Sequence, residues 1–168
     1  MNMQKITFRQ NIVPDDIGRI KKLSLSTGMF THDEINVAIE LVIEHLVRKE
    51  HSGYFFFIAE KGRNSIIGFS CFGPIPCTRG SFDLYWIAVH PFYQGKGIGS
   101  LMLGMSENSM LSMGAKRVYI ETSSREIYSP TRLFYEKKGY TIASEVGDFY
   151  SDGDSKIIFV KSLESAGA

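Results

Sequence analysis

The spacing of hydrophobic residues changes along the chain, and each change predicts a strand or a helix. Residues 54–60 (YFFFIAE) contain almost no polar side chains, which predicts a strand that is covered on both faces. Residues 31–46 instead place apolar residues at every third or fourth position, which predicts an amphipathic helix that opens with a capping box between Thr31 and Glu34. We expect the buried side of this helix to consist of Ile35, Ala38, Ile39, Val42, Ile43 and Leu46.

The other segments can be interpreted in the same way. Predicted strands cover residues 6–9, 65–73, 81–89, 117–123, 141–149 and 156–163, and predicted helices cover 15–27, 98–112 and 129–139. The first of these helices should end at Gly28, and the last should begin with Ser129 as its N-cap. The order is β-α-α-β-β-β-α-β-α-β-β, in which the unit at 81–123 requires a crossover between parallel strands. We therefore expect an α/β fold (α+β in some schemes) with a mixed central sheet of about six to seven strands and helices on both faces.

Composition and charge narrow the class of protein. A chain of 168 residues with 43% hydrophobic and 22% charged residues is typical of one folded domain, here residues 1–163, followed by a frayed tail at 164–168. The formal net charge of +1 gives no reason to expect nucleic acid or a membrane as partner. We expect a cytoplasmic protein, because no segment has the pattern of a signal peptide or a membrane span. Cys71 and Cys77 should be free thiols, and their spacing predicts no metal site.

The sequence VHPFYQGKGIGS (89–100) places Gly95, Gly97 and Gly99 between a predicted strand and a predicted helix. A helix N-terminus presents unpaired N–H groups, and glycines let a ligand approach the backbone closely, so the expected ligand is a phosphate. The loop lacks the G-x-G-x-x-G pattern of dinucleotide sites and the G-K-[ST] ending of ATP-binding loops. By itself this loop could equally be a plain tight turn.

Two further motifs give the loop a context. Gln94, Gly97 and Gly99 fit the pattern Q/R-x-x-G-x-G/A, and they follow V-x-P at residues 89–91. RLFYEKKGY at 132–140 and the final hairpin at 148–163 stand at suitable distances behind it. Together these segments resemble the GNAT superfamily of acetyl-CoA-dependent N-acetyltransferases, most closely over 81–163 and weakly over 1–50. The predicted order of elements is also that of this superfamily.

The resemblance implies an acyltransferase that uses acetyl-CoA as cosubstrate, with the CoA pyrophosphate bound by residues 94–100. The expected cofactor-binding residues are Ile87, Ala88, Val89, Gln94, Gly95, Lys96, Gly97, Ile98, Gly99, Ser100 and Tyr128. Tyr128 stands where the superfamily often has an asparagine, so the contact that this asparagine makes is in doubt, and Ser124 or Arg125 are alternatives. A backbone N–H near Val89 is the expected donor to the oxyanion.

The resemblance also implies catalytic residues. Tyr135 matches the tyrosine that faces the CoA sulfur, and its alternative is a packing role in an amphipathic helix. Asp83 stands where one branch of the superfamily has a glutamate as general base, and Glu121 on the neighbouring strand is the second candidate. Strand alternation predicts that Asp83, Tyr85, Ile87 and Val89 share one face. Because aspartate is shorter than glutamate, we expect a proton relay through water.

The sequence says least about the acceptor, the molecule that would receive the acetyl group. We expect transfer of the acetyl group to a primary amine, on a small or amino-acid-like molecule, directly within a ternary complex. A protein N-terminus or lysine is the alternative acceptor, and a CoA-binding module without turnover is the alternative of another class. Residues 28–34 and the residues Asp148, Tyr150 and Asp152 are candidates for the acceptor walls, and a homodimer is left open.

Overall fold

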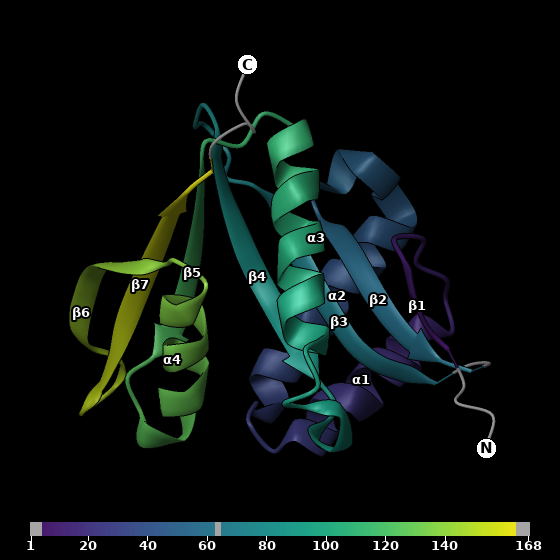
Figure 1. Ribbon diagram of the computed structural model, residues 1–168, viewed down its shortest axis with the longest axis horizontal. Helices are drawn as coiled ribbons and strands as arrows, with labels where there is room; N and C mark the ends of the chain where they lie inside the picture. Colours follow the sequence, from purple (N-terminus) through teal and green to yellow (C-terminus); the bar gives the residue numbers. More distant parts are fainter. Residues whose placement is uncertain (1–4, 63–64, 164–168) are drawn as a thin grey trace.

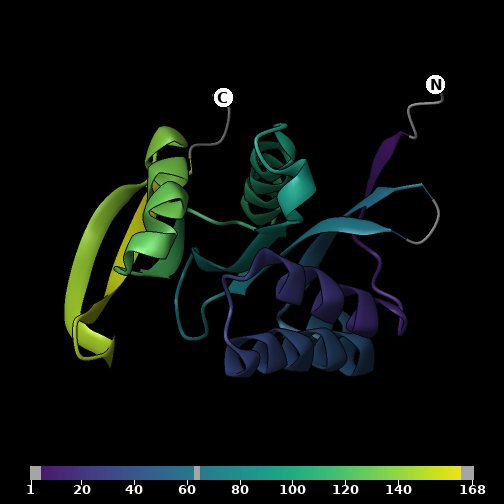
Figure 2. The same cartoon turned by 90° about the horizontal axis from the view of Figure 1, so that it is seen from below.

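The computed structural model describes residues 5–62 and 65–163, and within them the chain folds around one seven-stranded sheet in the order β1-β2-β3-β4-β5-β7-β6. Helices α1 and α2 cover one face of the sheet, and α3 and α4 cover the other (Figures 1 and 2). The strands are β1 (Ile6–Arg9), β2 (Phe55–Lys61), β3 (Ile66–Pro74), β4 (Ser81–Val89), β5 (Arg117–Ser123), β6 (Thr141–Ser151) and β7 (Asp154–Ser162). The helices are α1 (Asp16–Thr27), α2 (His32–Arg48), α3 (Ile98–Ser112) and α4 (Ser129–Lys137), with short 3₁₀ turns η1 (Lys49–Ser52), η2 (Pro91–Tyr93) and η3 (Glu126–Tyr128).

This architecture confirms the predicted order of strands and helices and the mixed sheet. The turn residues 63–64 and the tail 164–168 lie outside the described residues. In the part of the chain that the structure describes, no helix is long and apolar enough to cross a membrane. Cys71 is buried and Cys77 is exposed, and both are free thiols.

Local sequence signals account for most helix boundaries. The capping box of α2 is present, since the Thr31 side chain accepts from the Glu34 N–H and the Glu34 carboxylate accepts from the Thr31 N–H. Gly28 ends α1 in the left-handed conformation, with φ 64°. The prediction for Ile43 was wrong, because this side chain is 44% exposed at the edge of the buried stripe.

The predicted start of α4 was also wrong. Ser129 is not the N-cap but the first residue of the helix, with φ −55° and ψ −45°, and Tyr128 precedes it. The physical reason is that η3 runs directly into α4, so Ser129 is already helical and cannot adopt the extended conformation that a capping serine needs.

Two strands in the middle of the sheet separate and create the space for a site. β4 and β5 pair in parallel only from Ser81–Asp83 to Arg117–Tyr119, at one end of both strands. Beyond these residues the two strands diverge, as Figure 1 shows, while β4 stays paired with β3 and β5 with β7. The resulting gap connects the two faces of the sheet.

A β-bulge in β4 overturns the prediction that Asp83, Tyr85, Ile87 and Val89 share one face. Phe72 of β3 pairs with Leu84 and Cys71 pairs with Trp86, so Tyr85 is an extra residue that has no partner in the ladder. The extra residue reverses the alternation. Tyr85 and Trp86 both pack toward the α1–α2 core, whereas Ile87 and Val89 pack on the α3 side. Asp83 lies between Phe82 and Leu84, which face the α3–α4 core, so its side chain points to the α1–α2 face.

Candidate functional site

A cleft of about 1100 Å³ occupies the gap between β4 and β5. On the α3–α4 face its walls are the glycine loop, the start of α3 and one side of α4. On the opposite face its walls are the loop between α1 and α2 and the residues around the β6–β7 turn. We call these the helix-terminus side and the α1–α2 side of the cleft. A ligand in the gap can therefore contact both sides at once.

The helix-terminus side presents unpaired backbone N–H groups. Gly97 caps α3 with φ 81°, and the first backbone hydrogen bond of the helix runs from the Leu101 N–H to the Gly97 carbonyl. Within the described residues, the N–H groups of Ile98, Gly99 and Ser100 have no acceptor. A Cβ placed on Gly95 or Gly97 would meet no atom within 4 Å, so the space in front of the loop is open. Free N–H groups, the helix dipole and open space suit a phosphate group.

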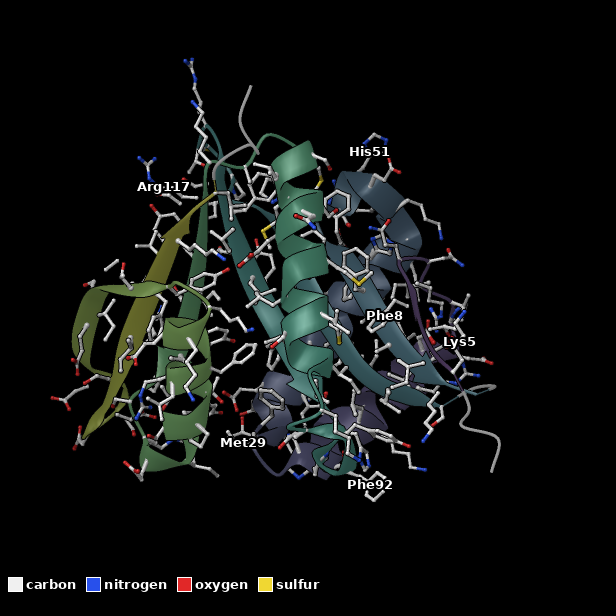
Figure 3. All side chains as sticks on the ribbon, in the orientation of Figure 1. Lys5, Phe8, Met29, His51, Phe92 and Arg117 are labelled. Atoms are coloured by element: carbon white, nitrogen blue, oxygen red, sulfur yellow. The ribbon has the colours of Figure 1, made fainter. Side chains whose placement is uncertain are left out.

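Of the residues predicted to contact the cofactor, all except Lys96 and Ile98 line the cleft. Ile87, Val89, Gln94 and Ser100 line the cleft, and the Gln94 amide donates to the Val89 carbonyl at 2.9 Å, which ties the loop to the end of β4. Ala88 also lines the cleft, but its side chain and that of Ile98 are buried in the core, so only their backbone could meet a ligand. The Lys96 ammonium lies 4.2 Å from the ring centroid of Phe92, which projects below the first turn of α3 (Figure 3).

Tyr135 presents a hydroxyl to the cleft from α4. Its ring is only 4% exposed and packs among Phe134, Tyr140 and Phe159. Within the described residues the hydroxyl has no hydrogen-bond partner, and Tyr135 lines the cleft. Burial raises the pKa of the Tyr135 hydroxyl, so the group is protonated at neutral pH and can donate a proton.

Asp83 and Glu121 lie together where β4 and β5 begin to separate. They line a small recess of about 160 Å³ with Leu84 and Tyr85. Burial, and then the charge of Glu121, raise the pKa of Asp83 to about 6, although Lys156 partly opposes this effect. Glu121 forms an ion pair of 2.7 Å with Lys156. Asp83 is therefore the carboxylate of the pair that titrates close to neutral pH, as a general base requires.

Tyr128 holds two walls of the cleft together. Its hydroxyl donates to the Met29 carbonyl at 2.9 Å, which joins η3 to the loop between α1 and α2 (Met29 is labelled in Figure 3). On the other side of the same loop, the Phe30 ring packs edge-on against Trp86 of β4, with ring centroids 4.9 Å apart. Residues 28–31, which we call the strap, are thus attached to β4 and to η3, the turn that follows β5 in the chain. Sequence reasoning missed this contact, which joins residues 99 positions apart, and no local pattern could have revealed it.

The α1–α2 side is acidic and aromatic. Glu34, Tyr150 and Asp154 line it, as predicted for Tyr150, whereas Asp154 was missed. Asp154 is buried, and its carboxylate accepts from the Ser123 hydroxyl at 2.5 Å and pairs with Arg125 at 3.3 Å.

Five of the predicted wall residues, Gly28, His32, Asp33, Asp148 and Asp152, are not among the residues that line the cleft. Asp148 accepts from the Gly153 N–H at 2.7 Å, so its side chain stabilises the β6–β7 turn. Asp152 is exposed in that turn, and His32 is exposed at the start of α2. The turn folds back on itself because Asp148 and Gly153 both have positive φ angles, 52° and 79°.

Comparison with known proteins agrees with this geometry. The family model described as an acetyltransferase (GNAT) domain matches residues 52–142, which is more than half of the chain. A crystal structure of a GNAT-family protein from Desulfovibrio desulfuricans is similar over 95% of this chain and 100% of its own, with 38% identity and a TM-score of 0.92.

Two more distant structures share the fold. The ribosomal-protein-S18-alanine N-acetyltransferase of Escherichia coli has 16% identity and a TM-score of 0.74 over 97% of both chains. The yncA protein of Salmonella typhimurium, solved with acetyl-CoA, has 15% identity and a TM-score of 0.71 over 97% of this chain and 96% of its own. No curated protein sequence matches this chain. The chain belongs to the GNAT family of acetyl-CoA-dependent N-acetyltransferases.

Proposed function

We propose that this protein transfers the acetyl group of acetyl-CoA to the primary amine of a small molecule, by direct attack within a ternary complex. One observation carries the proposal: the half-buried Asp83, whose pKa is raised to about 6, lines a recess that shares Leu84, Tyr85 and Glu121 with the cleft, and the Tyr135 side chain lines the cleft itself. These two groups match the two proton transfers that acetylation of an amine requires.

The helix-terminus side suits the cosubstrate. The N–H groups at residues 97–100 would receive the pyrophosphate of CoA, with Gln94 and Gly95 shaping the loop and Lys96 adding positive charge beside it. The backbone of Ile87, Ala88 and Val89 borders the gap, where the pantetheine arm would run toward the reaction centre. A backbone N–H near Val89 would stabilise the oxyanion.

Asp83 would accept the proton of the amine. Deprotonating an alkyl ammonium group with a pKa near 10.4 costs roughly 4.6 kcal/mol at pH 7. A nearby base that accepts the proton lowers this cost. The bulge in β4 turns Asp83 toward the α1–α2 side, away from the glycine loop. The amine would therefore enter from the α1–α2 side, and its proton would reach Asp83 directly or through a water molecule.

Tyr135 would serve the departing thiolate as a hydrogen-bond donor and proton relay. A thiolate resembling that of cysteine has a conjugate acid with a pKa near 8.5, below the raised pKa of the Tyr135 hydroxyl, so the hydroxyl would pass a proton to the sulfur only as it takes one up from solvent. The Tyr135 hydroxyl has no protein acceptor within the described residues, which leaves it available for the CoA sulfur.

The strap favours a small acceptor over a residue of a folded protein. Tyr128 and Phe30 fix residues 28–31 across the end of the cleft, so the α1–α2 side is bounded on several sides. An extended peptide would have to displace the strap. Of the distant neighbours named above, one is named for an alanine of ribosomal protein S18 and the other is named without an acceptor; both share only the fold, so they do not decide this point.

The experiment is a measurement of free thiol released from acetyl-CoA in the presence of small primary amines or of peptides with a free N-terminus or lysine. We expect release with amines and little with peptides. Efficient release with peptides alone would favour the protein-acceptor alternative. CoA binding without release from any acceptor would indicate a binding module and overturn the proposal.

A further inference from the structure

The two sides of the cleft differ in charge. The residues that line the helix-terminus side include no carboxylate among those that the structure describes. Three carboxylates, those of Glu34, Glu121 and Asp154, line the α1–α2 side, and a fourth, that of Asp83, lies in the recess that adjoins it. A phosphate-bearing cosubstrate is compatible only with the first side, because carboxylates repel phosphates.

Two of the four carboxylates are already neutralised. Glu121 pairs with Lys156, and Asp154 pairs with Arg125. Among residues 5–62 and 65–163, no cationic side chain lies within 4 Å of Asp83 or Glu34. The α1–α2 side thus has two uncompensated negative charges, one at the point of reaction and one at the strap.

Two aromatic side chains line the cleft together with the second charge. Glu34, Tyr128 and Tyr150 are all among the residues that line it. Burial, and then the charges of Glu121, Asp154 and Glu34, raise the pKa of Tyr150 to about 12, so the negative charge of this side of the cleft acts on the Tyr150 hydroxyl. An ammonium group binds well between a carboxylate and the faces of aromatic rings.

The cleft is also lined by the Tyr135 side chain, which is 4% exposed and whose hydroxyl makes no hydrogen bond within the described residues, so the cleft is a ligand site rather than a solvated acidic surface. We infer that the acceptor carries a second positive charge besides the reacting amine, and that this charge binds at Glu34 between Tyr128 and Tyr150. This inference rests on the proposed function. It specifies a diamine or an amine with another cationic group, and it disfavours free amino acids, whose carboxylate would meet Glu34.

The test compares three acceptors of equal length with acetyl-CoA, by the rate of thiol release: butylamine, 1,4-diaminobutane and 4-aminobutanoate. With rates corrected for the fraction of neutral amine, we expect the diamine to exceed the monoamine in kcat/KM by about threefold to tenfold, and the amino acid to be slowest. Raising the salt to about 0.5 M should reduce this preference, because the charge pair is partly solvated.

Glu34→Gln tests the assignment to one residue. Glutamine keeps the capping box with Thr31, because its side-chain oxygen can still accept from the Thr31 N–H, but it removes the charge. We expect the diamine-to-monoamine ratio to fall toward one in Glu34→Gln. Asp33→Asn is the matched control, since it removes the same charge one residue away and Asp33 does not line the cleft.

The outcomes separate this inference from the proposed function. Equal rates with the monoamine and the diamine, or a faster rate with the amino acid, would overturn the inference and leave amine acetylation intact. A preference that survives in Glu34→Gln but fades at high salt would move the second charge to another carboxylate and overturn the assignment to Glu34. No thiol release with any of the three acceptors or with other amines would overturn the proposed function and the inference with it.

Discussion

The two sides of the cleft are built from different parts of the chain. The helix-terminus side comes from residues 87–100 and 130–135, all within the segment 52–142 that the family model matches. The α1–α2 side takes much of its wall from residues 27–34 and 150–154, outside that segment, although Asp83 and Glu121 on this side lie within it. One side offers backbone N–H groups and glycines, whereas the other offers carboxylates and aromatic rings.

This difference has a physical basis. A pyrophosphate needs donors and an open backbone, which one glycine loop and one helix N-terminus supply without any charged side chain. An amine needs acceptors and negative charge, which side chains must supply. Since carboxylates and phosphates repel each other, the two sets of groups work only on separate sides of the sheet. Asp83 and Tyr135 lie where the two sides meet.

The largest effect should come from the carboxylate at this meeting point. Asp83→Asn should lower kcat by about 10²-fold or more at pH 7, because the amine loses its proton acceptor. Wild-type activity should fall as the pH drops through about 6, where Asp83 becomes protonated. The deficit of the variant should shrink at high pH, because the amine then loses its proton to solvent. A pH–rate profile of both proteins checks this expectation.

Glu121→Gln is the matched comparison for Asp83→Asn, and we expect it to lose less activity because Glu121 pairs with Lys156. A larger loss in Glu121→Gln would make Glu121 the base. The fold should tolerate Asp83→Asn. Folding raises the pKa of Asp83 to about 6 from a usual value of about 4, so ionisation of this group destabilises the fold progressively between these two pH values and to the full extent above pH 6. At pH 8 the variant should therefore melt at or above the wild-type temperature.

Tyr135→Phe should lower kcat by about 10-fold to 10²-fold and change acetyl-CoA affinity little, because the hydroxyl acts mainly in the transition state. Tyr140→Phe is the control. Its ring packs against Tyr135, but its hydroxyl bonds Glu107 and Tyr140 does not line the cleft. Steady-state kinetics of both variants separate a lost proton donor from lost packing. Equal effects of the two substitutions would remove Tyr135 from the catalytic groups.

Gly97→Val should weaken CoA binding by about 30-fold, since a branched side chain would occupy the space in front of the α3 N–H groups. Gly114→Val is a close control at the other end of the same helix. Both glycines have positive φ, 81° and 91°, and open space at the Cβ position, so both valines strain the backbone alike. Calorimetry should find the loss of affinity only at Gly97. The same loss in both variants would point to strain instead of a phosphate site.

The smallest effect should come from the strap. Tyr128→Phe removes the hydrogen bond to the Met29 carbonyl and should change KM for the amine by about threefold, with KM for acetyl-CoA unchanged. Hydrogen exchange of residues 28–31 should become faster in the variant. A change in the KM for acetyl-CoA alone would instead assign Tyr128 to the cofactor, in the place of the asparagine that it replaces.

Features that depend on neighbours in the sequence were predictable. The capping box of α2, the left-handed Gly28 and the glycine loop before α3 all have their signals within a few residues. The order of strands and helices followed from hydrophobic spacing, because the period of the apolar residues and the glycines and prolines between segments are local properties of the sequence. The glycine loop and the start of α3 could therefore be predicted from local signals, whereas the place of Tyr135 beside them was implied by the resemblance to a known family.

Only the tertiary structure decided the α1–α2 side. The bulge at Tyr85 depends on the register between β3 and β4, and it turned Asp83 to the opposite face from the one that alternation predicted. The Asp154 carboxylate accepts a hydrogen bond from Ser123, 31 positions away in the sequence, and the Tyr128 hydroxyl bonds the Met29 carbonyl across 99 positions. Such contacts leave no periodic trace in the sequence, because they depend on which strands separate and which loops then meet across the gap.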